Sequence, residues 1–178
     1  LSRHLKPGMA YAVRSSANVE DSSDHSFAGQ FKSILNVRGV DHVVEAIRSV
    51  WAVAQSADVR AYAEKKGAAT GDVRMAVIIQ EMVEPVMSGV SFSKNPVTGL
   101  DEIVVEAVAG SGEALVQQGV TPRRWINKWG EWIVRPEQDE SDLAIVEQVV
   151  RQTKAIAETY GRPVDLEWVY DGDTVHWL

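Results

Sequence analysis

The sequence predicts an α+β protein of two lobes, each built on mixed, mostly antiparallel sheet with flanking helices. Short apolar runs end repeatedly in glycine, proline, asparagine or aspartate, as strands joined by tight turns do. Two stretches, 41–54 and 141–160, carry apolar residues at helical spacing. Residues 67–72 are rich in small side chains, which indicates a boundary. We therefore expect one lobe over residues 1–70 and a second over residues 71–178.

The first lobe should contain two strands and two helices. Residues 9–13 and 31–37 have strand-like patterns, and Gly29 closes the loop between them. The helix that begins near residue 41 is predicted by apolar side chains at helical spacing, namely Val43, Val44, Ile47, Val50, Trp51 and Ala54. Residues 56–67 predict a second helix, which Gly67 would end.

The second lobe should be richer in strands. Residues 75–83 are nearly all apolar, which predicts a central strand buried on both faces. A long amphipathic helix is expected from about residue 141 to residue 160, where Gly161 and Pro163 stop it. The remaining strands are expected at 88–93, 102–108, 124–129, 131–135, 164–170 and 174–178, the last pair forming a hairpin around Asp171-Gly172-Asp173.

Composition excludes several classes of protein. Of 178 residues, 18 are Lys or Arg and 25 are Asp or Glu, so the net charge is −7 and a basic nucleic-acid-binding face is not expected. The absence of cysteine excludes disulfides and thiolate metal sites. No apolar run approaches the roughly 18 residues of a membrane span. We therefore expect a cytoplasmic protein that binds neither nucleic acid nor membrane. Because the chain begins with leucine rather than methionine, we also expect it to be a fragment of a longer protein.

Arg14, Ser15 and Ser16 are the first candidate site. A guanidinium at the end of a buried strand, followed by two hydroxyl groups, offers the charged fork and small donors that bind phosphate oxygens. The alternative is an ordinary ion pair between Arg14 and Glu20 or Asp21. The residues alone leave both readings open.

Gln80, Glu81, Met82 and Val83 are the second candidate. Polar side chains interrupt an apolar strand where its end should meet a cleft, so backbone groups there could contact a purine between apolar walls. A strand that simply emerges into solvent would look the same.

Asp165 and Glu167 are the third candidate. Strand alternation places both carboxylates on one face of the last hairpin, opposite Leu166, Trp168 and Tyr170. Oxygen ligands of this kind could hold Mg²⁺ together with a triphosphate. Two acids on an exposed face that bind nothing are the alternative.

Four segments together resemble one family. "AVRSSANVEDSSDHSFAGQF", "VIIQEMVEPVMSGVSFSKNPVTG", "VVEAVAGSGEALVQQGVTP" and "GRPVDLEWVYDG" occur in the order found in the ATP-binding domain of phosphoenolpyruvate-utilising dikinases. That family includes phosphoenolpyruvate synthase, pyruvate phosphate dikinase and rifampin phosphotransferase. The resemblance implies an ATP-grasp fold, with Mg²⁺ and ATP held between two lobes. It also implies transfer of phosphate to a histidine on a separate swivelling domain, and then to a substrate on an acceptor-binding domain.

The resemblance also assigns roles to individual residues. Arg14 matches the family's phosphate-contacting arginine, residues 80–83 match the segment that lines the adenine pocket, and Glu167 matches the acid that binds Mg²⁺. It further implies that residues 27–30 close a loop over the phosphates. The family's Gln-x-Arg-Pro segment and its amino-terminal lysine have no counterpart here, so we expect a domain incomplete at both ends and inactive by itself.

Two departures support an alternative function. The family's Gly-Leu-Gly-Glu is Gly110-Ser111-Gly112-Glu113 here, and its Pro-Asp is Pro122-Arg123. The alternative is a degenerate, non-catalytic module that binds nucleotide or a protein partner.

Overall fold

The chain folds into two compact units. The computed structural model describes residues 1, 3–17, 21–22, 25–26, 33–54, 56, 74–111, 121–137 and 140–178. Its contacts divide the chain into Leu1–Met82 and Val83–Leu178. This division differs from the boundary expected near residue 70, because the strand that follows that segment pairs with a strand of the first unit.

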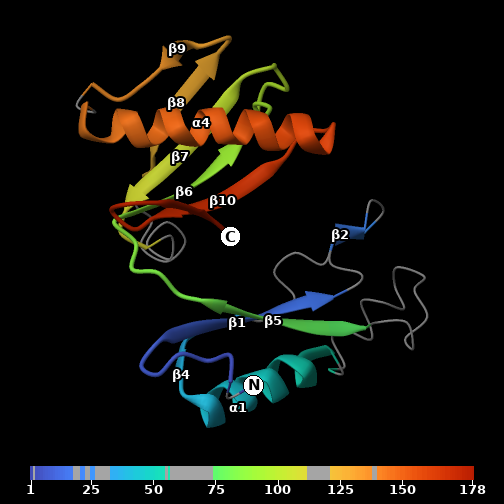
Figure 1. The fold of residues 1–178 in the computed structure, drawn as a ribbon. Helices are drawn as coiled ribbons and strands as arrows, with labels where there is room; N and C mark the ends of the chain where they lie inside the picture. Colours follow the sequence, from blue (N-terminus) through green and yellow to red (C-terminus); the bar gives the residue numbers. More distant parts are fainter. Residues whose placement is uncertain are drawn as a thin grey trace. The chain divides into compact units, whose positions relative to one another are not determined.

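The first unit is built on a three-stranded antiparallel sheet. Its strand order is β4-β1-β5, with β1 at Ala10–Ala17, β4 at Ile34–Arg38 and β5 at Met75–Glu81. Helix α1, Val40–Ala54, packs on one face of this sheet (Figure 1). The short strands β2 and β3, Asp21–Ser22 and His25–Ser26, pair only with each other among the described residues.

Helix α1 forms as its apolar spacing predicts. Gly39 precedes it with φ 82°, a conformation that glycine adopts without steric cost, and the carbonyl of Gly39 accepts the N–H of Val43 at 3.1 Å. One side of the helix is buried against the sheet, where the core consists of Tyr11, Val13, Val37, Val43, Ala46 and Val50. Burial of each valine side chain stabilises the fold by roughly 1.5–3 kcal/mol, because apolar surface is removed from water.

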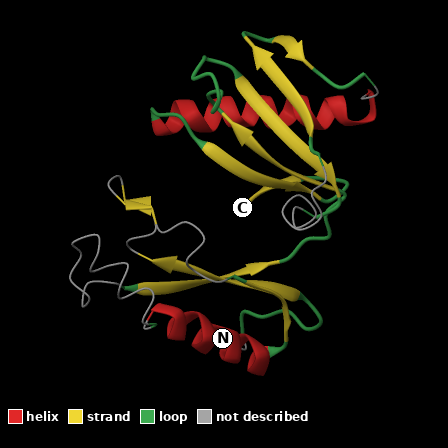
Figure 2. Ribbon diagram, turned by 180° about the vertical axis from the view of Figure 1, so that it is seen from behind, coloured by secondary structure: helices red, strands yellow, loops and turns green. Residues whose placement is uncertain are grey.

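The second unit is a six-stranded antiparallel sheet covered on one face by a long helix (Figure 2). Its strand order is β11-β10-β6-β7-β8-β9. The elements in chain order are β6 (Met87–Phe92), β7 (Ile103–Ala109), β8 (Arg123–Lys128), β9 (Glu131–Val134), α4 (Glu140–Tyr160), β10 (Asp165–Tyr170) and β11 (Val175–Trp177). All seven lie close to their expected ranges, so the α+β class is confirmed, and so are the six strands expected from residue 88 onward.

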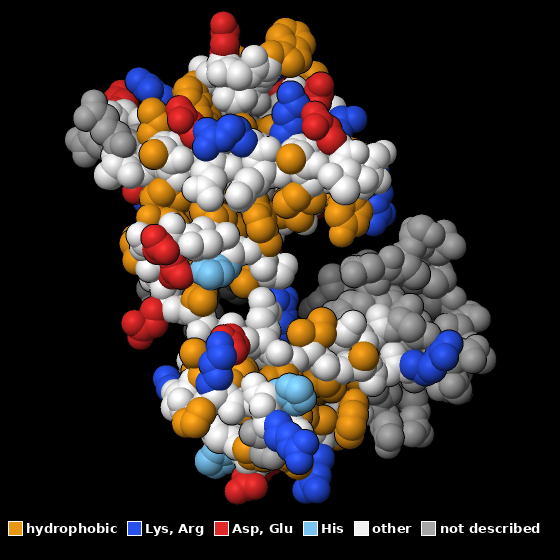
Figure 3. All heavy atoms as spheres, viewed as in Figure 1, with side chains coloured by type: hydrophobic (Ala, Val, Ile, Leu, Met, Phe, Trp, Pro, Cys, Tyr) orange, Lys and Arg blue, Asp and Glu red, His pale blue; other side chains and the backbone are white. Residues whose placement is uncertain are grey.

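The core of the second unit lies between α4 and the sheet. Trp125 and Trp168 are its largest fully buried side chains, and Val146 and Val149 meet them from α4. A polar contact crosses this layer, because Ser91 Oγ on β6 and Thr153 Oγ1 on α4 lie 2.8 Å apart and are both fully buried. Over the surface drawn in Figure 3, acidic and basic side chains are interspersed.

Three expectations for the first unit need correction or lie outside the described residues. Strand β1 extends to Ala17, so Arg14 lies within the strand rather than at its end. Strand β5 is paired with β1 alone among the described residues, and Ile78 is 49% exposed, so it is not a central strand buried on both faces. Beyond Ser56, the helix expected over 56–67 lies outside the described residues.

Candidate nucleotide-binding site

Arg14 and Gln80 meet on one face of the first unit's sheet. In the β1–β5 register, Arg14 lies opposite Ile78 and Ala12 lies opposite Gln80, so Arg14 and Gln80 are diagonal neighbours. Arg14 Nη1 donates a hydrogen bond to Gln80 Oε1 at 3.3 Å. Both side chains are partly exposed on the face away from α1. The sequence placed them in two separate candidate sites, and the structure brings these sites together.

The two serines after Arg14 point in opposite directions. Because side chains alternate along a strand, Ser16 shares the face of Arg14, whereas Ser15 shares the α1 face with the buried Val13. Ser16 can therefore add a hydroxyl group beside the guanidinium. Ser15 could contact a phosphate group on the Arg14 face only through its backbone.

The segment that follows Gln80 leaves the sheet through an ordered turn. Glu81 lies on the α1 face and pairs with Lys6 Nζ at 2.8 Å. This ion pair raises the pKa of Lys6, chiefly through the hydrogen bond to Glu81. Met82 donates its N–H to the carbonyl of Ala10 at 2.9 Å, and its Sδ accepts the N–H of Asn36 at 3.0 Å. Val83 begins the second unit.

Glu167 lies on β10 in the second unit, on the face of the sheet that α4 does not cover. Its neighbours Leu166 and Trp168 point toward α4, where Trp168 is fully buried, so Asp165 and Glu167 share the opposite, exposed face as the sequence predicts. Two exposed carboxylates two residues apart fit Mg²⁺, which in proteins is held by one or two carboxylates and completed by water and phosphate oxygens. Within the described ranges, no three His, Asp or Glu side chains form a metal site by themselves.

The sequence reasoning missed a third acid on this face. Register carries a single row across the sheet, from Glu167 to Val90, Glu106 and Arg124 on four successive strands. Glu106 Oε1 accepts from Arg124 Nη2 at 2.6 Å and from Arg124 Nε at 2.7 Å. The alternation of β7 could have indicated that Glu106 points away from the core. Only the strand order places it in the same row as Glu167, two strands away.

Arg123, which replaces an acid of the family pattern, has a structural partner. It forms an ion pair with Asp142 on α4, and its guanidinium lies 5.6 Å from the centre of the Trp125 ring. Arg123 thus ties β8 to α4 on the core side of the sheet, opposite the face of Glu106 and Glu167. Glu20, residues 27–30, Gly112 and Glu113, which the sequence analysis considered, lie outside the described residues.

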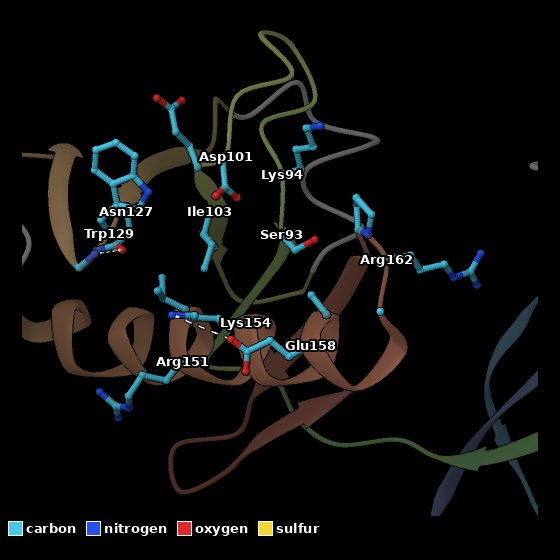
Figure 4. Close-up of a pocket in the computed structure, with 16 residues that line it drawn as sticks. Ser93, Lys94, Asp101, Ile103, Asn127, Trp129, Arg151, Lys154, Glu158 and Arg162 are labelled. Carbon is cyan, nitrogen blue, oxygen red and sulfur yellow. Dashed lines mark hydrogen bonds and ion pairs between the residues drawn. The ribbon is translucent and has the colours of Figure 1, made fainter.

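A pocket of about 760 Å³ lies elsewhere in the second unit (Figure 4). It is bounded by α4, the start of β7 and the β8–β9 turn, on the core side of the sheet. The labelled Arg151 and Arg162 point away from it, and Lys154 lies 4.0 Å from Glu158. Its charged side chains therefore do not converge on one point, and it lacks the polar arrangement of a ligand site.

Comparison with known proteins shows the family of the chain. Residues 1–148 match the family described as pyruvate phosphate dikinase, AMP/ATP-binding domain. The chain belongs to this family of nucleotide-binding domains.

The individual relatives are much longer than this chain. A probable phosphoenolpyruvate synthase of Pyrococcus horikoshii is 34% identical over 206 residues, which cover 96% of this chain and 25% of the relative. A rifampicin phosphotransferase of Streptomyces sviceus is 33% identical over 194 residues, or 94% of this chain and 22% of the relative. A prodigiosin synthesizing transferase of Serratia marcescens is 32% identical, over 99% of this chain and 23% of the relative. The chain thus spans about a quarter of each relative.

Among the helices that the structure describes, none is long and apolar enough to cross a membrane.

Proposed function

We propose that this chain is the Mg-ATP-binding domain of a dikinase-type phosphotransferase. In that role, ATP would phosphorylate a histidine on a separate swivelling domain, for onward transfer to pyruvate or another acceptor held by a third domain. The observation that carries the proposal is the Arg14–Gln80 contact in a chain that belongs to an AMP/ATP-binding family. The relatives' names and their greater length support a multidomain phosphotransferase.

The residues of the first unit would bind the nucleotide by charge and backbone contacts. Arg14 would neutralise phosphate oxygens, Gln80 would hold its guanidinium in place, and Ser16 would add a hydroxyl donor. The backbone of residues 81–83 would contact the adenine, with Met82 and Val83 as apolar walls. Phosphoryl transfer needs little covalent chemistry from the protein, so these positioning roles would suffice.

The acids of the second unit would hold Mg²⁺. Glu167 would be the ligand, assisted by Asp165 on the same face of β10. The bound ion would supply neutralisation of charge on the phosphates. Glu106 lies in the same row, where Arg124 already engages its carboxylate. Its role would be to keep the Arg124 guanidinium on the same face of the sheet as Glu167.

Calorimetric titration of the protein with Mg-ATP tests these assignments. We expect Arg14→Ala to weaken binding by about 10- to 100-fold, because it removes charge-assisted hydrogen bonds worth roughly 1.5–3 kcal/mol. Glu167→Ala should weaken Mg-ATP binding but leave ATP binding in EDTA nearly unchanged. Arg48→Ala on α1 and Glu147→Ala on α4 remove the same charges from exposed helix positions and serve as controls.

Two results would contradict the proposal. Equal Mg-ATP binding by the wild type, Arg14→Ala and Glu167→Ala would favour the degenerate nucleotide- or partner-binding module. A loss in Glu167→Ala that is the same with and without Mg²⁺ would remove the metal role of that acid. Circular dichroism of each variant separates these outcomes from misfolding.

A further inference from the structure

His176 and Glu167 lie on the same face of the β10–β11 hairpin. In the register of the two strands, Val169 is opposite His176. The next pair joins Trp168 to Trp177, and both of these indole rings lie on the side of α4, where Trp168 is part of the core and Trp177 packs against it. Alternation therefore places Glu167, Val169 and His176 together on the face that α4 does not cover.

Glu167 and His176 are diagonal neighbours across the two strands. Glu167 is two residues from Val169 along β10, and the N–H of Leu178 donates to the carbonyl of Glu167 at 3.0 Å, so the ladder continues past this point. Diagonal neighbours of an antiparallel pair are about 7–8 Å apart, within reach of long side chains. A metal ion that lies roughly 2 Å from an oxygen and a nitrogen ligand fits between two such side chains.

Asp171 holds the imidazole of His176 in place. Asp171 Oδ2 lies 2.7 Å from His176 Nε2, and the two side chains are 28% and 37% exposed. The other oxygen, Oδ1, accepts the N–H groups of Asp173 at 2.9 Å and of Thr174 at 2.8 Å. The turn thus fixes the carboxylate, and the carboxylate fixes the ring through Nε2. This leaves Nδ1 as the nitrogen that can take a ligand.

The fixed ring directs Nδ1 away from the turn. Asp171 lies two residues beyond Val169 on the side of the turn, and Glu167 lies two residues before it, so His176 stands between them along the hairpin. The two nitrogens of an imidazole direct their hydrogen bonds away from each other. With Nε2 held toward Asp171, Nδ1 therefore faces the side on which Glu167 lies.

The contact with Asp171 also selects the form of the ring that binds metal. An ionised carboxylate only accepts hydrogen bonds, so Nε2 carries the hydrogen and Nδ1 of the neutral ring carries the lone pair. Histidines that bind metals are typically held in this way, with a carboxylate on the nitrogen that does not touch the ion. The Asp171–His176 pair thus has the form of a metal ligand with its supporting carboxylate.

An imidazole beside a carboxylate changes which metal ion the face prefers. Mg²⁺ is bound by oxygen atoms, whereas the dications of the transition metals also take imidazole nitrogen. Mn²⁺ shares the oxygen ligands of Mg²⁺ and accepts this nitrogen as well. Water or phosphate oxygens would complete its coordination, since no three His, Asp or Glu side chains of the described ranges form a metal site by themselves.

We infer that His176, oriented by Asp171, is a metal ligand together with Glu167 and makes this face of the second unit select Mn²⁺ over Mg²⁺. The inference rests on the proposed function only for the metal role of Glu167. It adds a nitrogen ligand that neither the motifs nor the family match assigns.

Metal titrations without nucleotide test the selectivity. Electron paramagnetic resonance of free Mn²⁺ gives the Mn²⁺ affinity, and competition against it gives the Mg²⁺ affinity. We expect the wild type to bind Mn²⁺ more tightly than Mg²⁺. His176→Phe should lower the Mn²⁺ affinity by about tenfold or more, the size of effect typical of losing a group that supports a metal site, with little change for Mg²⁺. His42→Phe on α1, which removes an exposed imidazole from the first unit, is the control.

Asp171→Asn tests the positioning role separately. Its amide oxygen can still accept from the turn, but its amide nitrogen donates to Nε2, which moves the ring hydrogen to Nδ1 and blocks the ligand position. We expect this variant to lose Mn²⁺ selectivity as His176→Phe does. Nuclear magnetic resonance of the imidazole rings reports the tautomer, and in the wild type sub-stoichiometric Mn²⁺ should broaden the His176 signals and not those of His42.

The outcomes separate this inference from the proposed function. If Glu167→Ala loses both metals while His176→Phe keeps the ratio of the wild type, the imidazole is not a ligand and the Mg²⁺ role of Glu167 stands. If Glu167→Ala changes neither metal affinity, the metal role of that acid fails and this inference fails with it. A lower melting temperature of His176→Phe with an unchanged metal ratio would show a purely structural histidine and would also overturn the inference.

Discussion

Gly89 shows how closely the strands and the core of the second unit approach each other. It is buried on β6, and a methyl group there would overlap the carbonyl oxygen of Glu106 and lie 2.8 Å from Cζ2 of Trp168. The backbone of β7 and the indole ring thus occupy the space that any side chain would need. Glycine is required here by packing, since its φ angle is not in the left-handed region.

We expect Gly89→Ala to lower the free energy of unfolding by about 3 kcal/mol, at the upper end of the usual cost of overpacking, because one contact is with backbone that cannot rotate away. Urea denaturation measures this. Gly8→Ala is the control, since no atom lies within 4 Å of its Cβ and only its φ of 77° opposes a side chain, at about 1 kcal/mol. Equal losses in the two variants would show that β6 and β7 can separate to accept the methyl group.

Some residues of the candidate site could be predicted from the sequence, and others could not. Strand alternation was enough to place Glu167 and Asp165 on an exposed face. The same rule could not join Arg14 to Gln80, because their contact depends on the pairing of strands that are more than 60 residues apart in the chain. Glu106 was missed for the same reason, since only the strand order places it in the row that contains Glu167.

At the scale of elements, the β10–β11 hairpin combines a fixed turn with a functional face. Thr174 N–H, followed by His176 and Asp173 N–H, holds the pKa of Asp171 well below its ordinary value of 3.8. Because the folded-state pKa is lower than the unfolded one, Asp171 stabilises the fold above pH 4, and this contribution is lost as the pH falls through the folded-state pKa.

We therefore expect the wild type to lose more thermal stability than Asp171→Asn between pH 5 and pH 2. The amide keeps an acceptor for the turn but does not titrate, so the difference in melting temperature should narrow as the pH falls. Scanning calorimetry at a series of pH values measures it. A constant difference over this range would mean that the Asp171 carboxylate does not stabilise the folded hairpin.

A second element is the turn at residues 95–99, Asn-Pro-Val-Thr-Gly, which in the sequence was only part of a family resemblance. Asn95 is 7% exposed, and its Oδ1 accepts the N–H groups of Val97 and Thr98 while its Nδ2 donates to Glu102 at 2.9 Å. This hydrogen bond is the main cause of the lowered pKa of Glu102, and Lys128 also contacts that carboxylate. Asn95 thus connects this turn to Glu102 at the start of β7, and Lys128 of β8 contacts the same carboxylate.

For the whole molecule, local pattern predicted two lobes but assigned β5 to the wrong side of the division. Its apolar run resembles the central strand of a sheet, and the small residues before it look like a boundary. The structure pairs all seven of its residues with β1, so β5 completes the first unit's sheet. Pairing between distant segments is a tertiary property, and no window of sequence contains it.

The two hydrophobic cores share no residue, which predicts separate responses to core substitutions. Val43→Ala should cost about 2 kcal/mol and should reduce hydrogen-exchange protection in β1, β4 and β5. Val146→Ala should cost a similar amount and reduce protection in β6, β7 and β8 instead. Exchange measured by mass spectrometry on peptides from these strands distinguishes the two patterns. Loss of protection in all six strands for either variant would contradict the separation.

The alternation in β10 has a consequence for insertions and deletions. Even-numbered positions of this strand carry Trp168 and Tyr170 into the core, with Leu166 on the same face, and odd-numbered positions carry Asp165 and Glu167 outward. A shift of one residue would bury the acids and expose the indole. The same change would therefore disrupt the core and remove the carboxylates from the exposed face. The number of residues between Pro163 and Trp168 is therefore constrained as strictly as their identity, and length variation in this hairpin should be confined to its turn, residues 171–173.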